Sequence, residues 1–327
     1  GTIKGPRKLF MTHLDTVPLC SGAKPIQKKN RIESKNDTAL GGDNRTGVAC
    51  LSTMIIYLLK NNIPHFPITI LYTVREEDGG WGARCVDPKT LGNPSMGFNV
   101  DGDSPQNITI GAVGADRWEV ELFGKAAHAG DSPEKGASSS IAVSIALREI
   151  YKKKWFGKIL KNGKRGTSNV GIIAGRDGLS AGNATNVITD YVKVIGESRS
   201  HNPNFIRSIT NAYRDEFTKA SRLVKDNRGR SLRLSFKALR EYHPFLLKKN
   251  SYVVKKALAV AKSFGWKTKL IITDGGLDAN WTVSHGIPTI TFGAGQKNVH
   301  TVKEHVLIKQ YLYACHYAVA LATNNSK

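Results

Sequence analysis

The chain has 327 residues, of which 40% are hydrophobic and 23% charged, and its formal net charge is +22. This length fits one large or two medium domains, and no apolar run is long enough for membrane insertion. The 48 Lys and Arg residues are scattered without a nucleic-acid-binding motif. We therefore expect no specific recognition of nucleic acid.

The cysteines and the first residues bear on the cellular compartment. Cys20, Cys50, Cys85 and Cys315 are widely spaced and form no CxxC pattern, which predicts free thiols rather than disulfides or a cysteine zinc site. The opening segment GTIKGPRKLF lacks the apolar stretch of a signal peptide. Because free thiols suit a reducing environment, we expect a cytoplasmic location.

The first third of the chain alternates between strand and helix patterns. Residues 7–16 and 66–74 are predicted strands, with a predicted helix at 41–62 between them. Residues 80–92 pass through a glycine-rich turn into a short helix or loop, and residues 96–103 form another strand. This alternation predicts an α/β sheet, at least partly parallel, with helices on both faces.

The pattern changes near residue 112. From there the order is strand, helix, strand, strand, helix, strand, in residues 113–130, 132–153, 167–178, 186–200, 202–224 and 229–245. This is the order of ferredoxin-like domains. Residues 251–265 then resume as a helix, and 269–295 return to an α/β pattern. The sequence therefore predicts an α/β domain of residues 1–111 and 247–327, interrupted by a ferredoxin-like α+β domain of residues 112–246.

Side chains that can bind a metal stand where the expected strands of the α/β domain end. They are His13, Asp43, Glu76, Glu77, Asp101 and His300. Two histidines and three carboxylates suit a borderline metal such as Zn²⁺, bound through nitrogen and oxygen. The remaining carboxylate, Glu76, can serve as the general base.

The local context of these residues supports specific roles. His13 and Asp15 share one face of a strand, so Asp15 can accept a hydrogen bond from the imidazole. Asp43 follows two glycines and precedes a helix; its two oxygens can bridge two cations, although Asp is also an ordinary helix N-cap. Glu76 and Glu77 are adjacent, so one can bind metal while the other faces the substrate water. A lone acidic pair would otherwise be a solvated turn.

At two positions a nearby residue of the same type could be the metal ligand instead. Asp103 lies two residues after Asp101, which is closer to the strand end, and His305 lies near His300. With either choice the set meets the needs of a two-metal hydrolase: two cations lower the pKa of a shared water, and a base accepts its proton as it attacks a carbonyl.

The motifs HLDTVP, GGDNRTG, EEDGGWGA, the Asp101 segment and GAG…H…E occur in this order. With them the sequence resembles the M20-type di-zinc metallopeptidases, and HLDTVPLCSGAKP and VIGESRSHNP are most similar to the peptidase T-like branch. The resemblance covers nearly the whole chain. It implies a zinc exopeptidase-like catalytic domain interrupted by a dimerisation and lid domain.

The resemblance also implies which residues hold the metals. His13 and Asp101 would hold one zinc, and Glu77 and His300 the other. Asp43 would bridge both. Mn²⁺ and Co²⁺ tolerate the same ligands.

Further roles follow from the same resemblance. Glu76 would be the general base, and Asp15 would orient His13. Asp278 in DGGLDAN looks like a structural partner near the metals.

In the inserted domain, His128 in FGKAAHAG is similar to a histidine that reaches the partner subunit's active site, which implies a homodimer. Without the resemblance His128 reads as a helix-start histidine with a local hydrogen bond. Arg199 in GESRS resembles an arginine that binds a substrate carboxylate, and Asn183 or Asn186 would line the same site.

The expected activity is hydrolysis of short peptides. Members of the family with Asp at the position of Asp101 tend to be aminopeptidases, whereas Glu goes more with carboxypeptidases and deacylases. The alternative function is that of a deacylase or carboxypeptidase. A more remote alternative is a non-catalytic homologue that binds peptides. One departure is that twelve residues precede His13, where family members usually carry several dozen.

Overall fold

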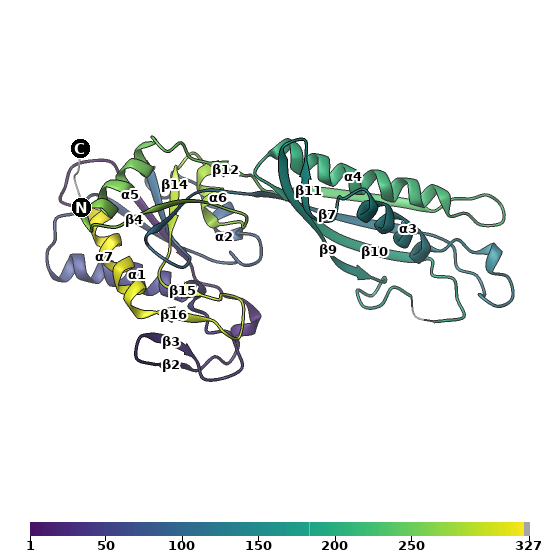
Figure 1. Cartoon of the computed structure of the whole chain (residues 1–327), viewed down its shortest axis with the longest axis horizontal. Coiled ribbons are helices and arrows are strands. Elements are labelled where there is room, and N and C mark those ends of the chain that lie inside the picture. Colours follow the sequence, from purple (N-terminus) through teal and green to yellow (C-terminus); the bar gives the residue numbers. More distant parts are fainter. Residues whose placement is uncertain (183, 324–327) are drawn as a thin grey trace. The chain divides into compact units, whose positions relative to one another are not determined.

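The computed structural model describes residues 1–182 and 184–323. The chain forms two compact units. We call Gly1–Ala112 with Phe245–Lys327 the split unit, and Val113–Pro244 the inserted unit. In Figure 1 the purple, blue and yellow segments belong to the split unit and the teal segments to the inserted unit.

The split unit is built around a mixed, largely parallel sheet, which confirms the predicted α/β class. Its strands are β1 (Lys8–His13), β4 (Ile68–Thr73), β5 (Met96–Val100), β6 (Asn107–Ala112), β12 (Phe245–Leu246), β13 (Lys269–Thr273) and β14 (Thr289–Phe292). They lie in the order β12-β6-β14-β5-β1-β4, with β13 beside β6. Strand β6 pairs antiparallel with β12 and β14, whereas β1 runs parallel to both of its neighbours.

Apolar clusters cover both faces of this sheet. The helices of the unit are α1 (Gly42–Lys60), α2 (Trp81–Arg84), α5 (Tyr252–Ser263), α6 (Asp278–Ser284) and α7 (Ile308–Thr323). Successive side chains of a strand point to opposite faces. Accordingly Phe10 of β1 packs with residues of α1, α5 and α7, whereas Leu9 and Met11 pack with Ala83 of α2. Strand β1 is therefore buried over its whole length.

The carboxyl ends of β1, β4 and β5 meet at one edge of the sheet. In the parallel register His13 lies opposite Thr73, and Met11 lies opposite Asn99. The segments that follow these three strands carry Asp15, Glu76 and Asp101. This edge is where ligands bind in open α/β sheets.

A small antiparallel sheet joins the two halves of the split unit. It consists of β2 (Pro25–Gln27), β3 (Arg31–Ser34), β15 (Gln296–Lys297) and β16 (His305–Leu307). Strand β3 pairs with β16, so the loop that carries His300 is tied to the first part of the chain. The short 3₁₀ turn Pro18–Cys20 precedes β2.

The inserted unit packs two helices against one antiparallel sheet. Its elements are β7 (Gly114–Phe123), the 3₁₀ turn Pro133–Lys135, α3 (Ser139–Lys152), β8 (Gly157–Lys161), β9 (Lys164–Ala174), β10 (Tyr191–Ser200), α4 (Pro203–Leu223) and β11 (Arg233–Tyr242). The strand order is β11-β7-β10-β9-β8. Helix α4 begins at Pro203 behind Asn202, whose side chain accepts a hydrogen bond from the amide of Phe205.

The inserted unit has one strand more than the predicted β-α-β-β-α-β order. Strand β8 forms a hairpin with β9 through Asn162 and Gly163, whose φ angles are 50° and 69°. An Asn-Gly pair with two positive φ angles is the favoured short hairpin turn. The prediction omitted β8 because the lysines of GKILK hide the alternation of a strand.

The chain also returns to the split unit earlier than the predicted boundary. The last strand of the inserted unit, predicted at 229–245, ends at Tyr242, and Phe245 and Leu246 pair instead with β6. Pro244 lies between the two segments and has no N–H to continue the β11 ladder. Consequently residues 245–246 belong to the split unit.

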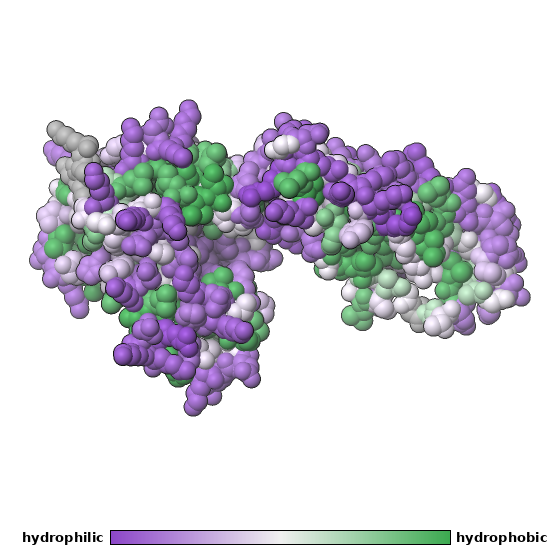
Figure 2. Space-filling model, viewed as in Figure 1, coloured by the Kyte–Doolittle hydropathy of each residue, from purple (hydrophilic) through white to green (hydrophobic). Residues whose placement is uncertain are grey.

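The surface and the cysteines complete this description. Hydrophilic residues cover most of the visible face of each unit (Figure 2). Among the described residues, none of the helices has both the length and the apolar character to span a bilayer. All four cysteines are free; Cys85 is exposed and the other three are buried.

Candidate metal centre

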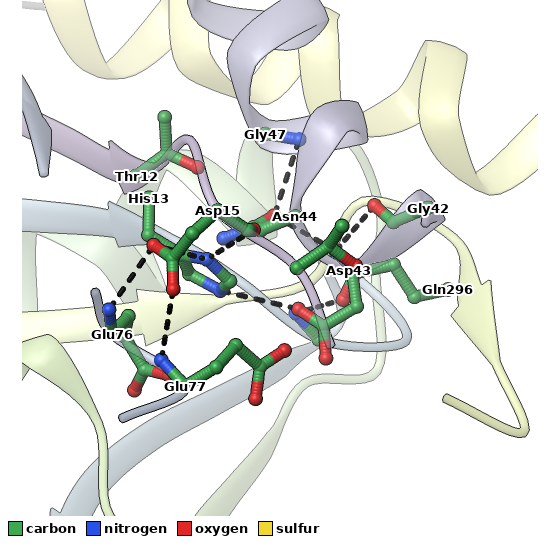
Figure 3. A network of polar contacts seen from close by, with 12 residues as sticks. Thr12, His13, Asp15, Gly42, Asp43, Asn44, Gly47, Glu76, Glu77 and Gln296 are labelled. Carbon is green, nitrogen blue, oxygen red and sulfur yellow. Dashed lines mark hydrogen bonds and ion pairs between the residues drawn. The ribbon is translucent and has the colours of Figure 1, made fainter. Parts of the chain in front are cut away.

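Three of the predicted metal ligands converge at the edge where β1, β4 and β5 end. His13 is the last residue of β1, Asp43 lies in the first turn of α1, and Glu77 follows β4. One nitrogen or oxygen atom from each of the three lies within 4.8 Å of the others. Figure 3 shows their side chains turned toward one another. These residues can therefore hold a metal ion.

The carboxylate of Asp43 lies between two imidazoles. Its Oδ1 is 3.2 Å from Nε2 of His13, and its Oδ2 is 3.3 Å from Nε2 of His300. The same nitrogen of His300 is 2.8 Å from Oε1 of Glu77. Each oxygen of Asp43 thus faces a different nitrogen donor.

Asp15 contacts His13 mainly through its main chain. Nδ1 of His13 is 3.0 Å from the carbonyl oxygen of Asp15 and 3.6 Å from its carboxylate. A proton on Nδ1, donated to that carbonyl, leaves Nε2 free to bind a cation. The Asp15 carboxylate instead accepts the backbone N–H groups of Glu76 and Glu77, both at 3.1 Å. It therefore fixes the segment that carries the predicted base.

Asp101 and Asp278 supply further negative charge at this edge. Asp101 directly follows β5 and lies near enough to Asp43 and His13 to interact electrostatically with both. It is not part of the group of three described above. Asp278 begins α6 and is buried; its Oδ2 accepts a hydrogen bond from Thr73.

Burial, together with neighbouring carboxylates, raises several of the acids' pKa values. Burial, with Asp43 adding to it, raises the pKa of Asp101 to about 7. Burial raises the pKa of Asp278 to about 6. For Glu76, burial and the charges of Asp278 and Asp101 raise the pKa well above its ordinary value. A bound cation would lower these pKa values again, because it favours the charged carboxylates.

The histidines are shifted in the complementary direction. Burial opposes the charged form of His13, but contacts with Asp15 and Asp43 raise its pKa to about 12. Contact with Asp43 raises the pKa of His300 to about 9. Burial likewise opposes ionisation of Asp43, and its contacts with His13 and His300 hold its pKa at about 2. The raised pKa values of the two histidines favour their charged forms beside these carboxylates when no metal is bound.

The residues present fit a centre for divalent cations. Oδ1 of Asp43 is buried and has only the ion-pair contact with His13 at 3.2 Å, without a well-aligned hydrogen bond, and Oδ1 of Asp278 is buried without a hydrogen-bond partner among the described residues. Buried polar atoms without partners are rare in folded proteins and indicate a missing ligand. The mixture of imidazole and carboxylate donors suits Zn²⁺ and similar metals.

Three buried residues for which the sequence analysis gave no role surround the ligands. Asn44, Gln296 and Glu304 hydrogen-bond to the segments around Asp43 and Asp101. Two of them have a sequence context that pointed to them, since Asn44 follows Asp43 directly and Glu304 belongs to the quoted GAG…H…E motif. Nothing local distinguishes Gln296.

In the inserted unit, His128 and Asn186 lie side by side. His128 pairs with Val187 in an isolated bridge, and the amide of Ala129 donates to the carbonyl of Asn186 at 2.9 Å. Nδ1 of His128 accepts the backbone N–H of Asp131 at 3.0 Å. A neutral His128 therefore carries its proton on Nε2. Asn183, predicted to lie in the same segment, is outside the described residues.

Arg199 lies at the other end of the same pair of strands. In the register of β7 and β10, Tyr191 faces Phe123, close to the His128 segment, whereas Arg199 faces Ala115. Eight residues of strand separate Tyr191 from Arg199, which is about 26 Å at 3.3 Å per residue. Arg199 donates to the carboxylate of Glu197 at 2.8 Å. The structure thus does not bring Arg199 together with His128.

Comparisons of sequence found similar proteins. The sequence model of Peptidase family M20/M25/M40 matches residues 9–324. The uncharacterized protein YqjE of Bacillus subtilis (strain 168) is 30% identical over 331 residues, which cover 100% of this chain and 84% of that protein.

Comparisons of structure give the same result. The crystal structure of the aminopeptidase PepT from Bacillus cereus ATCC 10987 has a TM-score of 0.80 and 28% identity, over 97% of this chain and 80% of that one. A tripeptidase from Staphylococcus aureus subsp. aureus Mu50 has a TM-score of 0.85 and 28% identity, over 98% and 81%.

Proposed function

This chain belongs to peptidase family M20/M25/M40 and is a metal-dependent peptidase, and on that premise we propose that it is a two-metal aminopeptidase that acts on short peptides. The observation that carries the proposal is the Asp43 carboxylate, whose oxygens lie 3.2 and 3.3 Å from His13 and His300. A carboxylate placed between two nitrogen donors is suited to bridge a pair of cations.

The proposed ligands divide between two Zn²⁺ ions, with Mn²⁺ or Co²⁺ as substitutes. His13 and Asp101 would hold one ion, and Glu77 and His300 the other. Asp43 would contact both. When bound, such cations lower the pKa of a shared water and polarise the scissile carbonyl.

Glu76 is the proposed general base. It would accept a proton from the attacking water and return it to the nitrogen of the leaving amine as the C–N bond breaks. Burial and the neighbouring charge of Asp278 raise the pKa of Glu76 well above its ordinary value, which suits a group that holds a proton between two steps. The hydrogen bond from its amide to Asp15 keeps it beside His13.

The preference for a free N-terminus is supported by two observations. Position 101 is Asp rather than the Glu that goes with carboxypeptidases and deacylases in this family. The similar solved structures include an aminopeptidase and a tripeptidase. Tripeptides are therefore the proposed substrates.

The inserted unit is proposed to form a homodimer and to contribute to catalysis. His128 of one subunit would support the oxyanion in the active site of the other, while Arg199 would bind the substrate carboxylate and Asn186 or Asn183 would line the site. The span of about 26 Å between the His128 and Arg199 ends of this unit supports contributions from two copies. The four free cysteines support a cytoplasmic location.

The test is hydrolysis of a free-amine tripeptide beside its N-acetylated twin, with zinc-reconstituted protein and with chelator. We expect cleavage of the free peptide only, and loss of cleavage with chelator. Cleavage of the acetylated twin would replace the proposal with a deacylase or carboxypeptidase. Binding of the peptide without turnover at saturating zinc would indicate a non-catalytic homologue.

A further inference from the structure

The two turns that carry Asp43 and Asp101 are joined by a buried polar network. Asp43 and Asn44 have non-helical φ and ψ angles inside the first turn of α1, and Asp101 lies just beyond β5. The first turn of α1 is thus irregular, whereas main-chain hydrogen bonds attach the Asp101 turn to the segment after β14: the N–H of Asp101 donates to Phe292 at 2.8 Å and the N–H of Ala294 donates to Gly102 at 2.9 Å. Figure 3 shows Asn44 and Gln296 beside Asp43.

Glu304 holds the main chain on the N-terminal side of the Asp43 carboxylate. It is 2% exposed. Its Oε2 accepts the N–H of Gly41 at 2.8 Å, and its Oε1 accepts the N–H of Asp43 at 2.9 Å. Gly42 lies between them, where an added Cβ would come within 3.3 Å of Glu304 and 2.7 Å of Val306. Both oxygens of a buried carboxylate are thus committed to this turn, which makes them strong, charge-assisted acceptors.

Gln296 connects the two turns. It is 1% exposed. Its Nε2 lies 3.0 Å from the carbonyl of Gly42 and 2.8 Å from Oδ1 of Asn44. Its Oε1 accepts the N–H of Gly102, directly after Asp101, at 2.6 Å. Because a carbonyl only accepts and an N–H only donates, these partners fix which end of the Gln296 amide faces each turn.

Asn44 makes a second connection between the same turns. Its Nδ2 donates to the carbonyl of Val100, directly before Asp101, at 2.8 Å. Its Oδ1 faces Gln296 and the amide of Gly47. The peptide groups on both sides of Asp101 are therefore tied to the Asp43 turn.

We propose that Asn44, Gln296 and Glu304 are positioning residues that set the spacing of the Asp43 and Asp101 carboxylates for a cation pair before the cations bind. This inference rests on the proposed metal centre and adds the residues that preorganise it. Two carboxylates held close together repel each other. The main-chain bonds fix the Asp101 turn on β14, and the neutral amides and the Glu304 contacts hold the Asp43 turn against that repulsion. If the turns were free, cation binding would have to order them, and affinity would fall.

The first test is metal binding by Gln296→Met, which keeps the size of the side chain and removes its hydrogen bonds. Metal-free protein would be titrated with Co²⁺ and with Zn²⁺, and the dissociation constants and the visible Co²⁺ spectrum recorded. We expect metal affinity to fall about 10- to 100-fold, as for other residues that orient metal ligands, and the Co²⁺ spectrum to change. Thermal unfolding of the metal-free variant would show that it is folded.

The matched control is Tyr317→Phe, which removes a buried hydrogen bond of 2.7 Å to the carbonyl of Ala257 in the same unit. It should lower the melting temperature and leave metal affinity unchanged. Glu304→Gln, which keeps the shape but turns one acceptor into a donor, is the second variant. It should weaken metal binding in the same way.

Three outcomes decide the proposal. Weakened metal binding in both network variants, with the control unchanged, supports it. Wild-type affinity and spectrum in the folded variants would overturn it, since a purely structural role changes only stability. Wild-type protein that binds no cation would overturn both this proposal and the metal centre. If the protein binds two cations but hydrolyses no peptide, only the proposed function is overturned. The positioning proposal stands in that case, because metal binding is measured without substrate.

Discussion

The two units of this chain arrange their candidate functional residues in different ways. In the split unit they converge at one sheet edge, where Asp43 contacts both His13 and His300. In the inserted unit they make local contacts, His128 with the amide of Asp131 and Arg199 with Glu197. They also lie at opposite ends of the β7–β10 pair.

This difference indicates which unit carries the chemistry. A buried cluster of like charges is unfavourable unless cations or protons balance it, so the split unit is built for a ligand. Local hydrogen bonds account for His128, whereas Nε of Arg199 is buried and has no hydrogen-bond partner among the described residues, so it is left to pair with a ligand. Its residues gain a catalytic role only if another active site receives them.

The largest expected effect is that of Glu76→Gln in the split unit. Removing a general base should lower kcat by about 10²- to 10⁴-fold, while the five proposed ligands keep the metal content of wild type. Steady-state kinetics and metal analysis measure both. The exposed Glu134→Gln in the inserted unit is the matched control and should be silent. Full activity of Glu76→Gln would eliminate the proposed mechanism.

A smaller effect is expected for His128→Ala in the inserted unit. Loss of an oxyanion donor typically costs about 10²-fold in kcat, and metal content should stay unchanged. The exposed His316→Ala, on α7, serves as the control. A wild-type kcat for His128→Ala would mean that the local hydrogen bond of His128 is its whole role.

Mixing variants tests whether His128 acts across subunits. A heterodimer of Glu76→Gln with His128→Ala has one site with both groups intact if His128 comes from the partner. Activity should then return when two nearly inactive proteins are mixed and allowed to exchange subunits. If the mixture stays inactive despite confirmed exchange, His128 does not serve a partner's site.

Arg199→Lys should have a more modest effect, on substrate binding. Lysine keeps the charge but loses the paired hydrogen bonds that arginine makes with a carboxylate. We expect KM to rise about 10-fold, equivalent to about 1.4 kcal/mol, with kcat less affected. Arg117→Lys, whose guanidinium pairs with Glu241, is the control. An unchanged KM would exclude Arg199 from the substrate site.

The smallest effect concerns stability of the metal-free protein, which should change in opposite directions in two pH ranges. In the split unit the pKa values of Asp101, about 7, and Asp278, about 6, lie above the ordinary value for Asp. The folded state then binds protons that the unfolded state does not, so stability rises as pH falls from about 7.5 to about 5.

Below about pH 4 the sign is reversed, because Asp43 in the split unit and Asp226 in the inserted unit both have lowered pKa values. Contacts with Arg230 lower the pKa of Asp226, so its stabilising contribution is present above its ordinary pKa and is lost as pH falls below about 4. Calorimetry with chelator at pH 7.5, 6, 5 and 3.5 measures both trends. A melting temperature that falls steadily between pH 7.5 and 5 would contradict the interpretation of the split unit.

Much of the fold could be predicted from local patterns. Apolar strands alternating with amphipathic helices specified the α/β class. The change in the order of predicted strands and helices near residue 112 indicated where the inserted unit begins. Strand β8 was missed although Asn162–Gly163 is a strong hairpin motif, because its lysines masked the alternation. The end of β11 was predicted too late. Pro244 has no N–H to donate to a neighbouring strand, and this matters only when the strands are paired in the folded sheet.

For the candidate site, the sequence by itself determined the kinds of donors and the strand ends that carry His13, Glu77 and Asp101, since residue type and strand pattern are local properties; Asp43 instead lies in the first turn of α1 and His300 in a loop. Only the tertiary structure decided that Asp15 contacts His13 through its carbonyl, that Arg199 lies far from His128, and that Gln296 and Glu304 hold the Asp43 turn. Gln296 and Glu304 meet that turn across 252 to 263 residues of sequence. Contacts at such separations leave no periodic pattern, because they arise when the sheet brings distant segments to one edge.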